Sequence, residues 1–380
     1  MNSSLSSVLK CASALLAASV IGCAPNDGAK ELEEGRAAYE VRDLKRAEKL
    51  FGESLACAPQ DADRILYLAR VKLDLGDLPA AQELSARALS LDGAATDVRL
   101  FAAQVAWHAK DYEKAAAGFK SLANDAKLPA DIRSQGWAGV GIVEMTRNKP
   151  HHARVALLLA LRQDRRNAAA WYHLGLLYRD GFGYLESALE QFDVFVHLEA
   201  DASPRVQKVQ RAIIPALKES IARTLADRPG ASKRDSAASS AAIGKAEAAW
   251  KKGDFKLARQ AYQDALAADP LSYPAALGLA KAWQKTDATK AGLTKALEAY
   301  KRACILRPSA VSTFLTTGSL AAQLGFHAQA VEVYSRAVAA TPTSLDAIDG
   351  LIRSLNKVGK QRRDDANAYQ SYRNAVAKKR

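Results

Sequence analysis

The sequence has few of the residues that build metal sites and disulfide frameworks. Only four cysteines and six histidines occur in 380 residues. Disulfide-stapled domains need more cysteines in a shorter chain, so no such framework is expected. His151 and His152 are adjacent and therefore point to different sides of a helix, and neither an HExxH nor a CxxC motif occurs. We expect no metal ion and no other cofactor.

Motifs for catalysis are also missing. The sequence has no G-x-S-x-G nucleophile elbow and no Walker phosphate loop. Gly139 and Gly141 form a short Gly-x-Gly, but no strand precedes them and they fall inside an expected helix. The sequence therefore predicts that the protein is not an enzyme and has no small-molecule substrate.

Series of strand-forming, β-branched residues are absent, whereas alanine and leucine dominate the composition. This balance favours an all-α protein. The formal net charge is +13, from 54 Lys and Arg against 41 Asp and Glu. Such a charge suits an acidic partner or an anionic surface, and it does not choose among nucleic acid, lipid headgroups and acidic proteins.

The apolar run near the N-terminus, residues 11–22, is too short to cross a bilayer, which needs about 20 residues. It follows a polar start with Lys10, so residues 1–22 have the pattern of a cleaved secretory signal peptide. The segment ends in VIGC, with the small residue Gly22 directly before Cys23. This ending resembles the lipobox of bacterial lipoproteins.

The lipoprotein resemblance implies that Cys23 becomes the mature N-terminus and that its thiol carries lipid, with acyl chains such as palmitate. Two or more chains anchor a protein stably, whereas a single chain holds it weakly. Residues 23–27 would form a short lipidated tether. In this class, Ala24 rather than Asp after the lipidated Cys implies the outer membrane, facing the periplasm. The alternative is an ordinary signal peptide that happens to contain a cysteine.

One pattern recurs along the chain: an Ala, an aromatic residue four positions later, and a second Ala three positions after that. Clear copies begin at Ala258, Ala296, Ala330 and Ala368. The leading alanines of clear and weaker copies follow one another at intervals of 34 to 38 residues, apart from one gap of 70 residues after Ala188. Such a period indicates helical repeats, each of which must stack on its neighbours to bury its apolar face.

The pattern resembles the tetratricopeptide repeat (TPR) family, whose signature is W-x2-L-G-x2-Y, then A-x3-F, then P. Trp171, Leu174, Gly175 and Tyr178 match its first half, and AWKKGDFKLARQAYQDALAADP matches its second half. The resemblance implies an all-α TPR solenoid in which a small residue of the first helix lets the second helix approach. About nine helix–turn–helix units are expected, starting near residues 28, 62, 96, 134, 168, 239, 273, 311 and 345.

The gap in the period divides the expected array into two blocks. Residues 28–200 hold about five repeats, and residues 239–380 hold about four, including a C-terminal capping helix. The stretch 201–238 between them has a Ser-Pro pair at its start, which predicts a helix as far as about Ala226. The Gly, Pro and Ser content of the residues after Ala226 indicates a flexible linker.

Several positions of the first helix line the concave face in resembling TPR proteins. The resemblance therefore implies a groove that binds protein partners, through basic and aromatic side chains of the kind that dominates hot spots. The groove candidates are Arg36, Tyr39, Arg70, Gln104, Trp107, His108, Tyr172, Trp250, Lys281, Lys285 and Arg353. The alternative is that the basic side chains are merely solvated and the aromatic ones pack against their neighbours.

Together these features predict a membrane-anchored, periplasm-facing TPR scaffold for protein partners in a cell-envelope assembly, secretion or export system. The alternative is an envelope-surface protein whose basic faces hold anionic polysaccharide, peptidoglycan or lipid. Residues 205–234 carry eight Lys and Arg against two acidic residues, and residues 351–380 carry nine against two. No nucleic-acid partner is expected, because export removes the chain from cytoplasmic nucleic acid.

Overall fold

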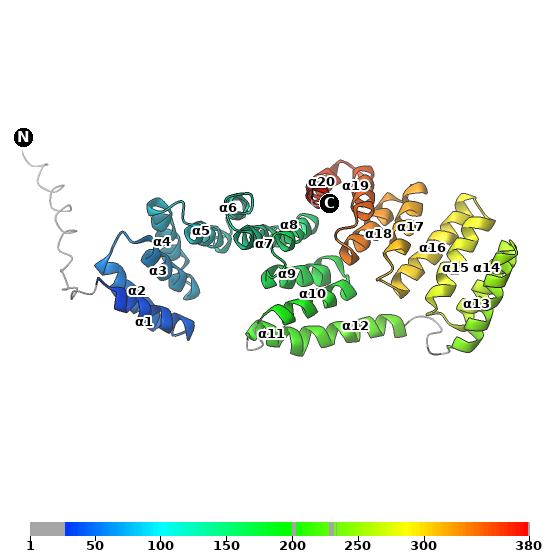
Figure 1. The fold of residues 1–380 in the computed structure, drawn as a ribbon, viewed down its shortest axis with the longest axis horizontal. Helices are drawn as coiled ribbons and strands as arrows, with labels where there is room; N and C mark the ends of the chain where they lie inside the picture. The colour runs from blue at the N-terminus through cyan, green and yellow to red at the C-terminus, as the bar shows by residue number, and fades with distance from the viewer. Residues whose placement is uncertain (1–26, 200–202, 228–231, 233, 379–380) are drawn as a thin grey trace, which may run out of the picture. The chain divides into compact units, whose positions relative to one another are not determined.

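The computed structural model describes residues 27–199, 203–227, 232 and 234–378 (Figure 1). All regular elements in these residues are helical, and they include nine helix–turn–helix pairs, which confirms the predicted all-α TPR solenoid. The chain divides into two compact units, an N-terminal unit that ends at Leu122 and a C-terminal unit that begins at Ala123. The expected signal peptide, residues 1–22, and Cys23 lie outside the described residues.

The N-terminal unit contains the first three repeats, and their first helices begin at or next to the predicted starts. The pairs are α1 (Ala29–Glu40) with α2 (Leu44–Cys57), α3 (Ala62–Asp74) with α4 (Leu78–Leu91), and α5 (Thr96–His108) with α6 (Tyr112–Ala123).

A residue with positive φ follows the first helix in each of these three pairs. It is Gly76 in the second repeat, but Arg42 and Lys110 in the first and third, with φ values of 84°, 64° and 62°. The turn lets the N–H of Asp43 donate to the carbonyl of Ala38 at 2.9 Å, which satisfies an acceptor at the helix end. The carboxylate of Asp43 then caps α2. Only glycine adopts this backbone conformation without strain, so two of the three turns carry a small conformational cost.

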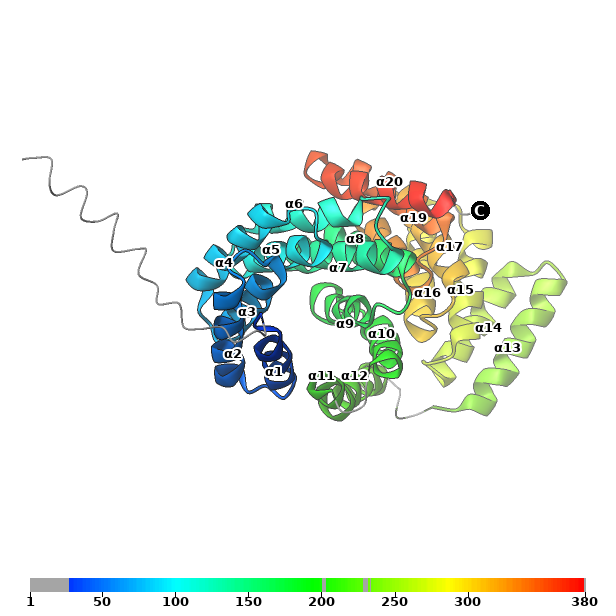
Figure 2. The same cartoon turned by 60° about the vertical axis from the view of Figure 1, so that its left-hand side comes forward.

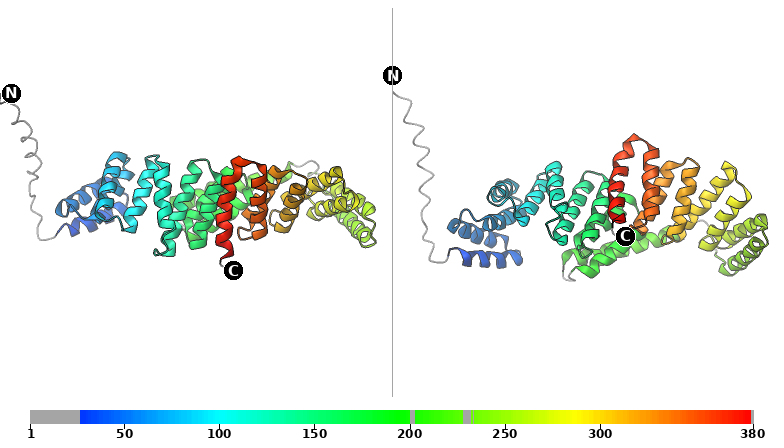
Figure 3. Two further views of the ribbon diagram at one scale, coloured as in Figure 1. Left: turned by 90° about the horizontal axis from the view of Figure 1, so that it is seen from above. Right: turned by 45° about the horizontal axis from the view of Figure 1, so that its top comes forward.

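The C-terminal unit contains six further pairs, and Figure 3 shows those from α13 to α20 side by side. The pairs are α7 (Ala130–Thr146) with α8 (Pro150–Gln163), α9 (Ala168–Leu176) and the π-helical turn η1 (Leu177–Phe182) with α10 (Leu185–Leu198), α13 (Ser236–Lys251) with α14 (Phe255–Ala268), α15 (Tyr273–Thr286) with α16 (Lys290–Leu306), α17 (Val311–Gln323) with α18 (His327–Ala340), and α19 (Leu345–Val358) with α20 (Arg363–Ala377).

Glycines of the first helices lie directly against aromatic rings of the second helices. A Cβ atom placed on Gly175 would lie 2.9 Å from the ring of Phe192, and one placed on Gly318 would lie 2.8 Å from the ring of Tyr334. Phe192 is completely buried and Tyr334 nearly so. The absence of a side chain therefore sets the spacing of the helices, as the repeat pattern predicts.

Helix α11 (Pro204–Lys208), the π-helical turn η2 (Val209–Ile213) and α12 (Ile214–Ala226) follow one another where the sequence predicts a helix. The π turn ends two residues before Pro215, which has no N–H to donate to the carbonyl four residues earlier. Val206, Val209 and Leu217 are buried, and the segment packs against α10. Helix α13 begins at Ser236, earlier than the predicted start near residue 239, because Asp235 caps it.

A contact that the repeat pattern does not predict joins the fourth repeat to the last two. Helix α8 packs against α20 (Figure 2), and Arg154 of α8 is fully buried. Its guanidinium donates to the hydroxyl of Tyr369 in α20 and to both oxygens of Ser335 in α18, at 2.6 to 2.9 Å. Repeats from both expected blocks thus share one compact unit, which begins at Ala123. The division of the repeats into blocks at 201–238 stays a prediction.

Candidate protein-binding surfaces

Three of the predicted groove residues come together in the N-terminal unit, around Tyr67 of α3. The guanidinium carbon of Arg36 lies 4.7 Å from the centre of the Tyr67 ring, and that of Arg70 lies 5.7 Å from it. Beneath them, Tyr67 stacks on Phe51, with ring centres 5.2 Å apart. We call Arg36, Tyr39, Tyr67, Arg70 and Asp74 the Tyr67 cluster.

At one side of the Tyr67 cluster, the Asp74 carboxylate accepts hydrogen bonds from Tyr39 and Arg42. The hydroxyl of Tyr39 donates to Asp74 Oδ2 at 2.8 Å, and Arg42 Nη1 donates to the same oxygen at 2.7 Å. Desolvation, together with the hydrogen bond to the Asp74 carboxylate, raises the pKa of Tyr39 above its ordinary value. Tyr39 is therefore a neutral donor at physiological pH, and the cluster as a whole presents guanidinium groups.

Sequence reasoning missed Tyr67 and Asp74. Asp74 occupies the same position in its repeat as His108 and Lys285 do in theirs, so a search for acidic as well as basic groove residues finds it. Tyr67 lies outside the groove positions of its repeat. Only the structure shows that Arg36 and Arg70, from two successive repeats, lie over its ring. Nothing in the repeat signature indicates that two arginines from successive repeats share one ring.

The predicted groove residues of α5 do not join this cluster. Gln104 and His108 are exposed, and half-buried Trp107 contacts the His108 ring edge-on at 4.8 Å. They form a separate polar and aromatic surface on the third repeat.

In the C-terminal unit, the predicted aromatic residues mostly serve packing. Tyr172 lies against Phe192 and Phe195, and the guanidinium of Arg205 from α11 covers its ring at 5.2 Å. Trp250 packs edge-on against Phe255, with ring centres 4.9 Å apart. Both rings therefore have intramolecular partners. The three predicted basic residues of this unit are exposed on α15 and α19: Lys281, Lys285 and Arg353.

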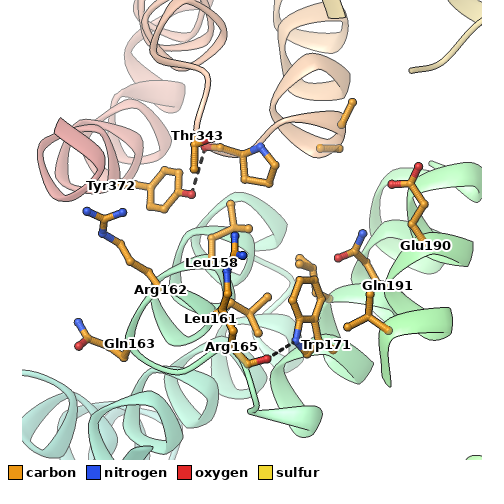
Figure 4. A pocket seen from close by; sticks show the side chains of 15 residues that line it. Leu158, Leu161, Arg162, Gln163, Arg165, Trp171, Glu190, Gln191, Thr343 and Tyr372 are labelled. Carbon is orange, nitrogen blue, oxygen red and sulfur yellow. Dashed lines mark hydrogen bonds between the residues drawn. The ribbon is translucent and has the colours of Figure 1, made fainter. Parts of the chain in front are cut away.

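A cleft of about 700 Å³ lies in the C-terminal unit and was not predicted (Figure 4). Its walls come from α8, α9 and α10 on one side and from the ends of α18 and α20 on the other. The lining residues are Leu158, Leu161, Arg162, Gln163, Arg165, Trp171, Leu174, Glu190, Gln191, Val194, Ala339, Ala340, Pro342, Thr343 and Tyr372. Because the α8–α20 contact brings these helices together, the repeat pattern alone could not reveal the cleft.

Two side chains at the border of the cleft are fixed by hydrogen bonds, which Figure 4 shows as dashed lines. The indole N–H of Trp171 donates to the carbonyl of Arg165 at 2.8 Å, and the hydroxyl of Tyr372 donates to the carbonyl of Pro342 at 3.1 Å. Burial raises the pKa of Tyr372 to about 12, so this hydroxyl stays protonated at physiological pH. The polar atoms of both aromatic side chains are thus engaged with backbone.

The described residues show neither a membrane-spanning helix nor a metal site. No helix in this part of the chain is both long and apolar enough to cross a bilayer. Likewise, no three His, Cys, Asp or Glu side chains are grouped there so that they could hold a metal ion. Cys304 is buried and lies 3.3 Å from the Thr317 hydroxyl, and burial raises the pKa of its thiol to about 11.

Comparison with known proteins identifies the repeats. A family model described as tetratricopeptide repeat matches residues 66–130, 243–310 and 291–344. No curated protein matches the sequence.

Among solved structures, the protein is similar to PilW, a type IV pilus biogenesis factor, at 15% identity over 66% of this chain and 98% of that one, with a TM-score of 0.41. It is similar to pilF of Pseudomonas aeruginosa at 16% identity over 66% and 95% of the two chains, with a TM-score of 0.40. MamA of Desulfovibrio magneticus RS-1 matches at 16% identity over 47% of this chain and 98% of its own, with a TM-score of 0.37. Similarity at this level assigns no function to the chain.

The family-model matches fall on observed helical pairs, from α3 to α6 and from α13 to α18. Solenoids of such repeats offer extended surfaces for other proteins, and the Tyr67 cluster and the cleft are the two candidates here. The described residues therefore form a tetratricopeptide-repeat α-solenoid, the architecture of a scaffold for protein–protein interaction.

Proposed function

We propose that this scaffold is anchored by lipid at Cys23, faces the periplasm from the outer membrane, and binds protein partners of a cell-envelope assembly or export system. The observation that carries the proposal is the lipobox-like ending VIGC, placed immediately before the repeat array. Only a few residues separate Cys23 from the start of α1 at Ala29. With two or more acyl chains on Cys23, the first repeat would be held close to the membrane surface.

The Tyr67 cluster gives this scaffold a surface that suits an acidic protein segment. Its two guanidinium groups lie over one aromatic ring, and the side chain of Arg36 is 37% exposed. Arginine and tyrosine dominate binding hot spots, because they combine apolar area with several hydrogen-bond donors. A carboxylate of the partner would compete with Glu33, which pairs with Arg36 at the surface.

The anchor is tested by expressing the full chain in a bacterium that processes lipoproteins and feeding it an alkyne-tagged fatty acid. The parent protein should become labelled and should fractionate with the outer membrane. Cys23→Ser should abolish the label, because the acceptor thiol is gone, while Cys304→Ser should leave it unchanged. Labelling that survives Cys23→Ser would remove the anchor from the proposal.

Partner binding is tested by affinity purification from detergent-solubilised envelopes. The parent protein should retain at least one specific envelope protein. The double change Arg36→Ala with Arg70→Ala should reduce that retention at least tenfold if the Tyr67 cluster is the docking surface. Lys45→Ala with Lys120→Ala removes the same charge from exposed sites of the same unit and serves as the control. If no specific envelope protein is retained, the scaffold proposal fails.

The alternative function, binding of an anionic envelope polymer, has support from α11 to α12. Lys208, Arg211 and Lys218 are exposed there, and none forms an ion pair within the described residues. This function predicts co-sedimentation with peptidoglycan or acidic polysaccharide that is lost in moderate salt, since screening weakens exposed charges. Trp107→Ala and Arg70→Ala should leave such co-sedimentation unchanged.

A further inference from the structure

The cleft of Figure 4 combines an apolar floor with walls of different charge. The picture places Glu190 and Gln191 on one side and Arg162 and Gln163 on the other, with Trp171 between them. The volume of about 700 Å³ falls within the ~300–1,000 Å³ of typical ligand sites.

The floor is available for apolar contact. Because the only polar atom of the Trp171 side chain already donates to the carbonyl of Arg165, the ring offers apolar area to an occupant. Leu161 and Leu174 lie beside it, and Val194 of α10 is 37% exposed. Leu161 and Leu174 are themselves almost fully buried, so a large apolar side chain entering the cleft would bury area mainly against Trp171 and Val194, and such burial is the main source of affinity in ligand sites.

The wall formed by α10 carries carboxylates without cationic partners. Glu190 lies one helical turn after Glu186 and one before Asp193, and none of the three forms an ion pair within the described residues. Desolvation and the two neighbouring carboxylates raise the pKa of Glu190 above its ordinary value. This acidic stripe stands out in a chain of net charge +13, and a cation placed there would relieve its mutual repulsion.

The opposite wall is basic, and it would repel a second cation. Arg162 donates to the carbonyl of Ala375 in α20, and exposed Arg165 also lines the cleft, next to Trp171. A basic occupant would thus be directed toward Glu190. Hydrogen-bonding groups for a peptide backbone are also present: the amide nitrogen of Gln191 is held by the carbonyl of Ser187, so its oxygen is left to accept.

We propose that this cleft binds an extended segment of a partner protein, in which a large apolar side chain lies on Trp171 and an adjacent Lys or Arg pairs with Glu190. The inference refines the proposed scaffold function and rests on it. Unlike the Tyr67 cluster, which suits an acidic segment, the cleft suits a basic and apolar one. The two surfaces would therefore accept different partners or different segments of one partner.

The test uses three fluorescein-labelled, amidated peptides on a Gly-Ser background, with Phe-Lys-Leu, Phe-Glu-Leu or Ser-Lys-Ser at the centre. Fluorescence anisotropy is measured with the full chain lacking only its signal segment and acyl groups. The Phe-Lys-Leu peptide should bind saturably. The Phe-Glu-Leu and Ser-Lys-Ser peptides should each bind at least tenfold more weakly, since each lacks one of the two interactions.

Variants locate the binding. Glu190→Gln should weaken the Phe-Lys-Leu peptide at least fivefold and leave the Phe-Glu-Leu peptide unchanged or tighter. Val194→Arg should abolish binding, because a long cationic side chain would fill the mouth of the cleft. Asp264→Asn removes an equivalent exposed carboxylate from α14 and is the matched control. Urea midpoints equal to that of the parent show that each variant is folded.

Two results would overturn the inference: no saturable binding of the Phe-Lys-Leu peptide by the parent protein, or equal binding by the parent and by Glu190→Gln or Val194→Arg. The envelope purification separates this failure from failure of the scaffold function. If the peptide test fails while the parent protein still retains a specific envelope protein, the scaffold function stands and only the cleft is discarded.

Discussion

Arg154 and Tyr369 stand 215 residues apart in sequence, yet Arg154 Nε donates to the Tyr369 hydroxyl at 2.6 Å in the interior of the C-terminal unit. His151 Nδ1 lies 3.2 Å from the same hydroxyl, and Arg362 Nη2 lies 3.3 Å from His151 Nε2. Because an arginine can only donate, Nε2 accepts and Nδ1 carries the hydrogen of a neutral imidazole. The α8–α20 contact is therefore a polar network around a buried cation, Arg154, for which the described part of the chain supplies no carboxylate partner.

Replacing Arg154 should destabilise the protein strongly. Arg154→Met keeps much of the volume but leaves the hydroxyl of Tyr369 and both oxygens of Ser335 without their donor, at an expected net cost of about 3 kcal/mol. Urea unfolding of the full chain measures it. Tyr369→Phe should cost less, and it should cost less still in the Arg154→Met background. An Arg154→Met variant as stable as the parent would show that the network contributes nothing to folding.

The contribution of the α8–α20 contact to stability should depend on pH through His152. The imidazole lies 3.2 Å from Asp364 and 3.3 Å from Asp365, and its hydrogen bond to Asp365 raises its pKa above the ordinary value of about 6.5. A raised pKa means that His152 contributes stability below that ordinary value and loses it as the pH rises through the folded-state pKa. The unfolding free energy should therefore increase between pH 8 and 6.5, and His152→Gln should remove this increase.

His151 should act in the opposite direction at lower pH. Burial, helped by the positive charge of Arg154, lowers the pKa of His151 to about 3. The native state therefore holds the neutral form, and stability falls as the pH drops from about 6.5, where the unfolded chain begins to take up the proton. His151→Gln should flatten this fall between pH 6.5 and 4. A parent profile without a maximum near pH 6.5 would contradict both assignments.

The left-handed turns offer a way to stabilise the N-terminal unit. Lys110→Gly should raise the unfolding free energy by about 0.5–1 kcal/mol, because glycine adopts a φ of 62° without strain. Arg42→Gly should gain less, since it also removes the ion pair with Asp74 at 2.7 Å. Gly76→Ala, the reverse change at φ 84°, should cost about 1 kcal/mol. Urea midpoints that order the three variants differently would argue against these turns as a source of strain.

Glycine positions inside helices should separate into two classes. A Cβ on Gly278 would lie 2.3 Å from the ring of Tyr262, so Gly278→Ala should cost about 1–3 kcal/mol through forced displacement. A Cβ on Gly244 would meet nothing within 4 Å, so Gly244→Ala should instead gain up to ~1 kcal/mol of helix propensity. Thermal unfolding of the two variants should shift in opposite directions. Equal shifts would mean that close approach at Tyr262 does not limit the packing.

The repeat fold was predictable because its signals are local. Small residues such as Gly175 and aromatic residues such as Phe192 recur at the spacing of one helical pair, and they contact each other within that pair. The helix at Pro204–Ala226 likewise carries its own start signal. These patterns depend on neighbours within some tens of residues, which a single sequence displays.

The α8–α20 contact and the cleft depend on the rotation that accumulates over many successive helical pairs. No local sequence pattern records this accumulated rotation. One signal for them does exist in the sequence. Val155 to Leu161 are all apolar and all buried, so this stretch of α8 has no polar face and must pack on two sides. An isolated pair of neighbouring repeats would cover only one of these sides. Arg154, directly before this apolar stretch, contacts the second packing partner, α20.

The α8–α20 contact also restricts how the number of repeats can change in evolution. An open repeat array tolerates the gain or loss of a unit, since each unit touches only its neighbours. The repeats between Arg154 and Tyr369, however, bring these two residues into contact. A duplicated or deleted repeat between them would therefore separate Tyr369 from Arg154. Repeat number in this segment is thus held constant by geometry, and insertions should accumulate in loops instead of as whole units.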